Sequence, residues 1–137
     1  MSMPQAPFAP PQPAPPMSVG SILFSFQGRI PRRVYWLALI ATSIVMNALN
    51  FVVGFVGGLV LPEDARPAIL LVVLPLAVVG FWMGLALAIK RWHDRGKSGW
   101  FVLITFIIPI IGWIWAFVEV GCLRGTVGPN QYGLDPT

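Results

Sequence analysis

The sequence predicts an all-α integral membrane protein with three transmembrane helices and a disordered, proline-rich N-terminal tail. The prediction depends on three apolar runs, each free of charged residues and long enough to cross a hydrocarbon core, which takes about 20 apolar residues. The runs are Val34–Leu61, Ala68–Ile89 and Trp100–Val118. All nine lysines and arginines lie outside them. The expected spans, all in one helical domain, are about 34–58, 68–89 and 100–122.

The first residues differ in composition from the rest of the chain. Residues 1–17 contain seven prolines among glutamines and alanines. Proline removes backbone donors and favours an extended, solvated chain, so this tail is predicted to be disordered, with a docking arm for a proline-binding partner as the alternative. The single membrane domain then covers residues 18–136. Its first part, Ser18–Phe26, is too short to span and is expected to lie among lipid headgroups.

Lysine and arginine counts orient the spans. Three arginines precede the first span and four cations lie in the 90–99 loop, against one in the 62–67 loop and one in the C-terminal tail. Because cytoplasmic segments carry the excess of lysine and arginine, the N-terminus and the 90–99 loop are predicted to be cytoplasmic. Three full spans then place the C-terminal tail on the opposite side.

The third span contains a helix breaker in its middle, at Pro109, with Gly112 close behind it. The main prediction is one helix kinked at Pro109, since proline is tolerated in a membrane helix where neighbours satisfy the freed carbonyl. The alternative is a re-entrant hairpin that descends through residues 100–108 and returns through 113–123. Such a turn needs cover from protein, and two other helices offer little, so the kinked span is preferred.

Small and polar residues fall on one face of each expected span. Helices in lipid associate through close backbone contact and interhelical hydrogen bonds, so we expect the three faces to converge on one seam, where Asn47 and Asn50 bond across helices. A solute path is the alternative, but its one ionisable residue, Glu119, is expected near the far interface. The stripes comprise Ser43, Asn47, Asn50, Gly54 and Gly57, then Gly80, Gly84 and Ala88, then Thr105, Pro109, Gly112, Ala116 and Glu119.

The 90–99 loop is the most chemically dense segment. Gly96 suits the left-handed residue that ends a helix, and Ser98 suits the N-cap of the next one. Asp94 lies among four cations and is expected to form an internal ion pair that stabilises the turn, with an arginine of the first segment as a candidate partner.

Three kinds of chemical site do not fit this loop. Gly96-Lys97-Ser98 resembles the end of a nucleotide-binding P-loop, but its first glycine would fall at position 91, which is arginine. Adjacent His93 and Asp94 do not face each other on a helix, as a Ser-His-Asp set would require. With one histidine and one cysteine in the chain, a metal site has too few ligands. We therefore expect no enzymatic activity, no cofactor and no metal.

The 90–99 loop is basic, has Trp92 and Trp100 on either side, and precedes the N-terminus of a helix. Such a turn can hold a phosphate or an anionic headgroup. The net charge of +4 is accordingly assigned to membrane lipid and not to nucleic acid. The expected partners are the lipid bilayer and its anionic lipids, and a membrane-protein partner or a homo-oligomer stays open. The candidate contacts for lipid or phosphate are Arg29, Arg33, Arg91, Arg95, Lys97 and Ser98.

Four motifs carry a family resemblance. They are Phe24–Ile30 with Arg32 or Arg33 before Tyr35-Trp36, then Arg91–Trp100, Ile108–Gly112 and Gly125–Pro136. In this order, over residues 24–136, the chain resembles the bacterial "domain of unknown function 805" family of small, YhaH/YhaI-like inner-membrane proteins. The resemblance implies a bacterial inner-membrane location, no established activity, and a C-terminal tail that folds back. The structural residues it implies are Gly28, His93, Asp94, Gly96, Gly99, Trp100, Pro109, Gly112, Asn130, Tyr132 and Gly133.

The combined prediction is a small, multi-pass bacterial inner-membrane protein of unknown activity. It is expected to act without enzymatic activity, as a partner or scaffold subunit with anionic-lipid contacts at the cytoplasmic 90–99 turn. The alternative is an oligomeric small-molecule transporter or channel, since three short helices enclose no pathway alone.

Overall fold

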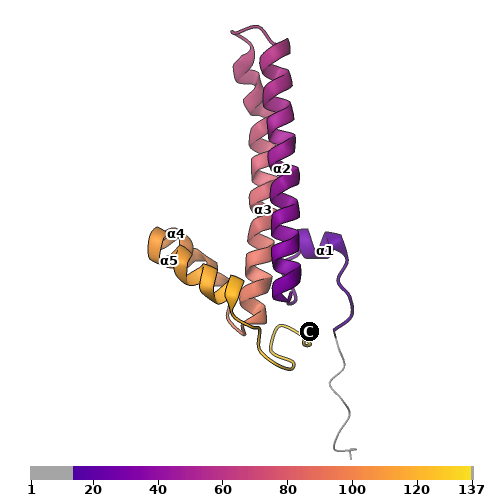
Figure 1. Ribbon diagram of the computed structural model, residues 1–137, viewed down its shortest axis with the longest axis vertical. Coiled ribbons are helices and arrows are strands. Elements are labelled where there is room, and N and C mark those ends of the chain that lie inside the picture. Colours follow the sequence, from indigo (N-terminus) through magenta and orange to yellow (C-terminus); the bar gives the residue numbers. More distant parts are fainter. Residues whose placement is uncertain (1–13, 137) are drawn as a thin grey trace, which may run out of the picture.

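Two long antiparallel helices form the body of the molecule (Figure 1). The computed structural model describes residues 14–136, so most of the predicted disordered tail, residues 1–13, lies outside the described part. Helix α2 covers Arg32–Val60, and α3 covers Leu70–Asp94 directly after the short 3-10 helix η1 (Arg66–Ile69). Both are long and apolar enough to cross a membrane, by length and composition. The all-helical prediction and the first two apolar helices are thus confirmed.

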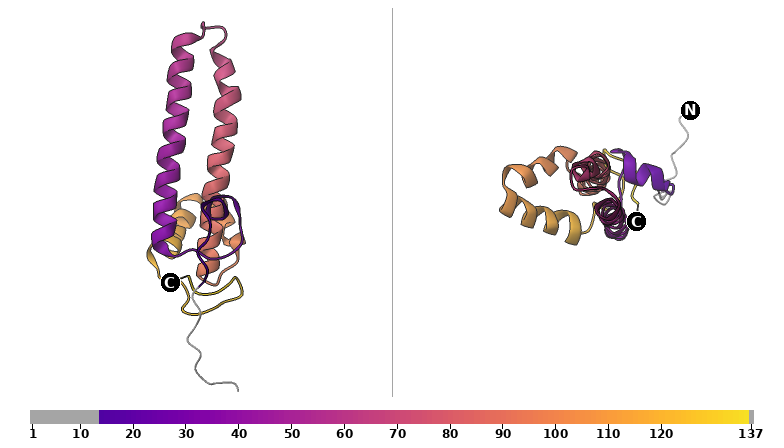
Figure 2. Two further views of the ribbon diagram at one scale, coloured as in Figure 1. Left: turned by 90° about the vertical axis from the view of Figure 1, so that its right-hand side faces the viewer. Right: turned by 90° about the horizontal axis from the view of Figure 1, so that it is seen from above.

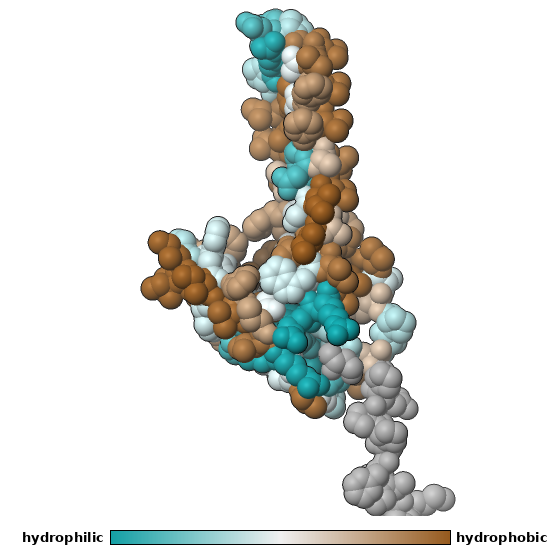
Figure 3. Space-filling view, viewed as in Figure 1, coloured by the Kyte–Doolittle hydropathy of each residue, from teal (hydrophilic) through white to brown (hydrophobic). Residues whose placement is uncertain are grey.

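The buried core lies at one end of the helix pair. No residue of α2 is buried, and the buried residues of α3 all fall between Met83 and Asp94. At this end, which we call the base, the N-terminal segment, the chain after α3 and the C-terminal tail gather around the two helices (Figure 2). Above the base the surface of the pair is largely apolar, interrupted by hydrophilic patches at mid-height and at the far end, as the space-filling view shows (Figure 3). Exposed apolar surface of this extent requires lipid or another protein to cover it.

A short helix, α1 (Val19–Phe24), packs across the lower part of α3. Ser18 caps it, because its Oγ accepts a hydrogen bond from the N–H of Ser21 at 3.2 Å. Near the other end of α1, buried Lys90 donates from Nζ to the carbonyl of Ile22 at 2.6 Å. The Phe26 ring contacts Trp82, with 4.7 Å between ring centroids. The N-terminal segment is therefore fastened to α3 by both polar and aromatic contacts.

The predicted third span, kinked at Pro109, is wrong. After the turn at residues 95–98 the chain forms a helical hairpin that projects sideways from the base (Figures 1 and 2). The break is at Ile108, whose φ of −124° and ψ of 81° end the outgoing arm. The outgoing arm comprises η2 (Gly99–Leu103) and α4 (Ile104–Ile107), and the returning arm comprises α5 (Pro109–Ala116) and the π-helix η3 (Phe117–Cys122). The reversal of the chain corresponds to the hairpin that the sequence offered as the alternative, with its arms at residues 99–107 and 109–122.

Local backbone chemistry explains why the hairpin tolerates its turn. The residue before a proline disfavours helical geometry, and Pro109 has no N–H to satisfy. The Ile108 N–H donates to the Ile104 carbonyl at 3.0 Å, and the Gly112 N–H donates to the Ile108 carbonyl at 2.7 Å. Gly112 also lets the arms meet, because a Cβ there would lie 3.1 Å from the Cα of Thr105. These two hydrogen bonds pair part of the backbone at the turn within the hairpin itself.

The common seam of three polar faces forms only between α2 and α3. A groove of about 190 Å³ lies between these helices, lined by Ser43 and Asn47 on α2 and by Gly80 and Gly84 on α3. We had expected Asn47 and Asn50 to form hydrogen bonds across helices, but they do not. Their amides donate within α2, to the carbonyls of Ser43 at 2.7 Å and Met46 at 2.8 Å. The third stripe lies on the hairpin, which leaves the helix pair at its base.

Candidate functional site

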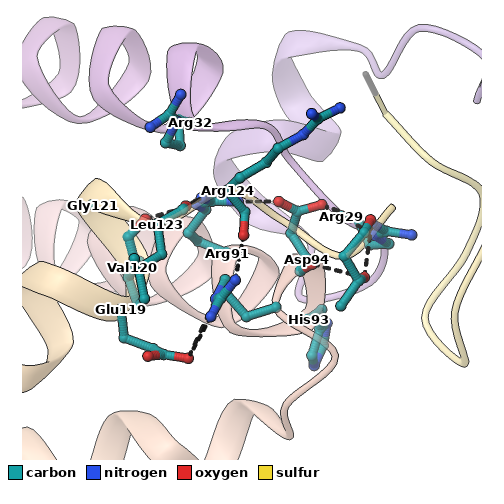
Figure 4. A network of polar contacts seen from close by, with 12 residues as sticks. Arg29, Arg32, Arg91, His93, Asp94, Glu119, Val120, Gly121, Leu123 and Arg124 are labelled. Carbon is teal, nitrogen blue, oxygen red and sulfur yellow. Dashed lines mark hydrogen bonds and ion pairs between the residues drawn. The ribbon is translucent and has the colours of Figure 1, made fainter. Parts of the chain in front are cut away.

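Asp94, the last residue of α3, is the centre of a buried polar network at the base (Figure 4). Its Oδ1 accepts hydrogen bonds from Nη2 of Arg29 at 3.0 Å and from Nε at 3.2 Å. Its Oδ2 accepts from Nη1 of Arg91. The side chains of Asp94, Arg29 and Arg91 are 2%, 1% and 0% exposed. Asp94 thus has the ion pair with an arginine of the first segment that its sequence position suggested, and a second pair within its own helix.

Arg29 also fastens the C-terminal tail. Its Nη1 donates to the carbonyl of Gly128 at 2.8 Å and to that of Gly133 at 3.3 Å, while Nη2 donates to the carbonyl of Thr126 at 2.7 Å. One buried guanidinium therefore links the start of the domain, the end of α3 and the tail. Its positive charge is balanced partly by Asp94 and partly by carbonyl dipoles, as a buried charge requires.

The tail folds back onto the end of α3, as the family resemblance implied. The Tyr132 ring stacks on His93, with 3.9 Å between the centroids and 6° between the planes. Asn130 donates from Nδ2 to the carbonyl of His93 at 2.9 Å and to Oγ1 of Thr126 at 2.9 Å. Gly133, with φ of 141°, occupies a conformation that other residues rarely adopt.

Arg91 fastens the end of the hairpin. Its Nε donates to the carbonyl of Val120 at 2.7 Å, and its Nη2 donates to that of Leu123. The indole of Trp36 donates to the carbonyl of Gly121 at 3.0 Å, and Nη1 of Arg32 donates to that of Cys122 at 2.7 Å. The last carbonyls of a helix lack partners within it, and cationic side chains satisfy them well. Both long helices therefore hold the returning arm by its free carbonyls.

Glu119 lies at the base and not near the far interface, where a third span would place it. Its Oε1 forms ion pairs with Nη2 of Arg95 at 3.1 Å and with Nζ of Lys97 at 2.5 Å. Burial raises the pKa of Glu119, but the hydrogen bonds from Lys97 and Arg95 outweigh burial and bring the pKa below its ordinary value. The Lys97 ammonium also lies 5.1 Å from the ring centroid of Trp115, a cation–π contact. These contacts fix the 95–98 turn against the hairpin.

The structure gives most of the predicted lipid contacts a different role. Arg29 and Arg91 are buried and bonded to protein, and Arg95 and Lys97 are paired with Glu119. Ser98 accepts the N–H of Trp100 at 3.4 Å and so acts as the expected N-cap. Of these candidates, Arg33 alone is exposed and makes no hydrogen bond or ion pair within residues 14–136.

The other residues taken from the family motifs are spread over the base and the hairpin. Gly28 and Gly96 have φ of 89° and 69°, so both turns need a glycine. Gly99 lies where a Cβ would come within 2.7 Å of Ile89. Trp100, in contrast, is 77% exposed on the outgoing arm.

Two residues that matter at the base, Arg124 and Gly125, were given no role there by the sequence analysis. Arg124 was assigned to the far side of the membrane, yet it lies beside Arg32 and Arg33 around one hollow. Gly125 passes so close to Asp94 that a Cβ would lie 2.5 Å from its Cγ. The signal for Gly125 was present, since it opens the last family motif. Among the described residues, no group of three His, Cys, Asp or Glu side chains is placed to hold a metal ion.

Comparison with known proteins finds relatives over most of the chain. The model of a family described as "Protein of unknown function (DUF805)" matches residues 23–134. Inner membrane protein YhaI of Escherichia coli K12 is 38% identical over 120 residues, which is 88% of this chain and 92% of that protein. Inner membrane protein YhaH of the same strain is 33% identical over 81% of this chain and 86% of that protein. Uncharacterized protein YiiR of Escherichia coli K12 is 31% identical over 87% of this chain and 90% of that protein. No solved structure matches significantly.

Proposed function

This chain belongs to the DUF805 family of proteins of unknown function, and from that premise we propose that it is a non-enzymatic partner or scaffold subunit of the inner membrane. It spans the membrane with α2 and α3, keeps the N-terminus, the hairpin end and the tail on the cytoplasmic side, and binds another membrane helix along the groove between α2 and α3. The cation counts and the apolar lengths of the two helices support this placement.

The observation that carries the proposal is the exposed amide of Asn47. Asn47 lies 15 residues after Arg32, hence about 22 Å along a helix of about 43 Å, in the middle of the apolar stretch. Its amide donates within α2, but the side chain remains exposed, and Ser43 beside it is exposed as well. A polar group at this depth is more stable against another helix than against acyl chains. The small residues Gly80 and Gly84 opposite allow such a helix to come close.

The charged residues support binding in preference to transport. The transport alternative placed a solute path along three polar faces, with Glu119 as its ionisable group. Glu119 is instead paired with two cations at the base, and the third face is absent from the helix pair. Asp94, Arg29 and Arg91 hold the N-terminal segment, the hairpin and the tail together. Such a clamp suits a protein whose task is to present fixed surfaces.

The test is mass spectrometry of everything retained after gentle extraction of the tagged protein. We expect a stoichiometric membrane partner, or a second copy of the chain, with the unaltered protein. Gly84→Leu fills the groove and should abolish the complex. Gly58→Leu is the matched control, because Gly58 is also a helical glycine with open space around it but lies outside the groove. A complex of unchanged size with Gly84→Leu would contradict the proposal.

A further inference from the structure

Three exposed arginines surround one hollow at the base. Arg32 and Arg33 open α2, and Arg124 follows the end of the hairpin. All three are exposed, and together with Pro31, Gly125 and Pro136 they line a pocket of about 450 Å³. The space-filling view shows hydrophilic surface gathered at the foot of α2, below the hydrophobic flank of the hairpin (Figure 3). The sequence had placed Arg124 across the membrane from the other two.

Arg32, Arg33 and Arg124 bring positive charge to this pocket, and the carboxylates of Asp94 and Asp135 lie near its wall. Neither Arg33 nor Arg124 forms a side-chain hydrogen bond or ion pair within residues 14–136, and Arg32 donates to a neutral carbonyl, that of Cys122. Asp94 also borders the pocket, but its carboxylate is already held by Arg29 and Arg91. Three guanidinium groups with free donors around one space are a recognition pattern for phosphate.

A second, apolar pocket is lined by residues that follow Arg33 in α2 and precede Arg124 in the hairpin, and it shares no lining residue with the first. Its volume is about 270 Å³, and it lies between the start of α2, the lower part of α3 and the returning arm of the hairpin, lined by Tyr35, Trp36, Leu39, Trp92, Trp113 and Phe117. Trp36 follows Arg32 by four positions, so it lies on the same face of α2 about one turn, about 5 Å, higher. On the hairpin, Gly121 lines the apolar pocket and Arg124 lines the basic one. Two chain segments therefore connect an aromatic groove to a cationic hollow.

We infer that these two pockets form one binding site for an anionic phospholipid of the cytoplasmic leaflet. The three arginines hold the headgroup phosphate, and the aromatic groove between α2 and the hairpin holds the first part of an acyl chain. A free phosphate ion shares the headgroup chemistry, but the apolar groove favours an amphipathic ligand. The inference rests on the membrane placement in the proposed function, yet it needs neither a protein partner nor the groove at Gly84.

The experiment is native mass spectrometry of the full chain after exchange into nanodiscs of phosphatidylcholine with or without phosphatidylglycerol. The test variant is Arg33→Ala/Arg124→Ala, because these two side chains make no contact that the described fold needs. One control, Arg33→Lys/Arg124→Lys, keeps the charge, and the other, Arg66→Ala, removes an exposed arginine from the opposite end of the helix pair. Thermal unfolding of each variant establishes that the fold is intact.

We expect the unaltered protein and Arg66→Ala to retain phosphatidylglycerol selectively. The double alanine variant should weaken this retention by about 30-fold, since each basic residue beside anionic headgroups contributes about a factor of five. The double lysine variant should fall between, because lysine lacks the two-pronged donor geometry. Excess inorganic phosphate should leave the lipid bound, because the ion has no acyl chain for the apolar groove.

Two results would overturn the inference. Equal retention of phosphatidylglycerol by the double alanine variant would show that these arginines do not form the site. Displacement of the lipid by inorganic phosphate would show an anion site without the acyl groove. In either case a protein partner that still copurifies with the double alanine variant would leave the proposed function standing. Loss of the partner through Gly84→Leu alone concerns only the proposed function.

Discussion

Substitution of Asp94 by asparagine tests the central claim about the base. Asparagine has the shape of aspartate but no charge, and its amide would face one arginine with donors in place of an acceptor. The side chains of Arg29 and Arg91, 1% and 0% exposed, would then be buried cations without a counter-ion. Both arginines would keep their backbone carbonyl partners, Arg29 would also keep Oγ1 of Thr126, and the new amide oxygen could accept from only one of the two arginines. We expect Asp94→Asn to loosen the N-terminal segment, the hairpin and the tail together.

The size of the effect follows from the burial of the pairs. Removal of one partner from a buried ion pair costs about 3–5 kcal/mol, because the remaining charge stays desolvated. Three carbonyl acceptors at Arg29 and two at Arg91 offset part of this, so we expect about 3 kcal/mol. The control is Arg66→Ala, which removes an exposed ion pair with Glu63, with side chains 48% and 88% exposed. Exposed pairs contribute about 0–1 kcal/mol, so this variant should unfold almost as the unaltered protein does.

The assay is unfolding in mixed micelles by increasing sodium dodecyl sulfate, followed by tryptophan fluorescence and circular dichroism. A second variant, Gly125→Ala, perturbs the same network without any change of charge, since its Cβ would meet the carboxyl group of Asp94. Both variants should lower the free energy of unfolding and speed amide exchange in residues 126–133. If Asp94→Asn falls within about 1 kcal/mol of the unaltered protein, like Arg66→Ala, the reasoning about the buried network is refuted.

Three further predictions concern the hairpin. Gly112→Ala should destabilise the protein by about 1–3 kcal/mol, because the added methyl group meets the backbone of Ile104 on the opposite arm; unchanged detergent unfolding would contradict this close contact. Cys122 is exposed, but the proposed topology places it on the cytoplasmic side, so in spheroplasts it should not react with an impermeant maleimide. A Glu63→Cys, Cys122→Ser variant, with its cysteine on the opposite side, should react. Labelling of Cys122 would restore the three-span arrangement. The lowered pKa of Glu119 stabilises the fold above the ordinary value of 4.5, and this contribution is lost as the pH falls through the lowered pKa. The free energy of unfolding of Glu119→Gln should therefore depend less on pH below 4.5 than that of the unaltered protein. An identical pH profile would count against the ion pairs.

Features that depend on short stretches of chain could be predicted from the sequence. The two long helices follow from apolar runs that need no partner to be recognised. The turn after α3 follows from Gly96, which has φ of 69°, and from Ser98, which caps the next helix. The order of four motifs identified the family, and the motif in the tail indicated that it folds back. Each apolar run, each cap and each single motif is a local stretch of the chain, and only the order of the motifs extends over most of it.

The path of the chain after residue 99 could not be predicted in this way. A proline in an apolar run is compatible with a kink and with a reversal, and the local sequence does not choose between them. The choice becomes clear only where Arg32 and Trp36 of α2 bind the carbonyls of Cys122 and Gly121, which are 90 and 85 positions away. The incorrect third span therefore placed Glu119 and Arg124 at the wrong end of the helix pair.

The sequence by itself determined the family, the membrane character and the two long helices, because hydrophobic length and helix capping act over a few turns of one segment. The tertiary structure decided which cations are buried and which are free. A guanidinium of Arg29 or Arg91 has the same chemistry in the sequence as that of Arg33, and only the acceptors that the fold brings around it decide its role. That placement is a property of contacts between distant segments, and it separates the buried clamp around Asp94 from the open basic pocket beside it.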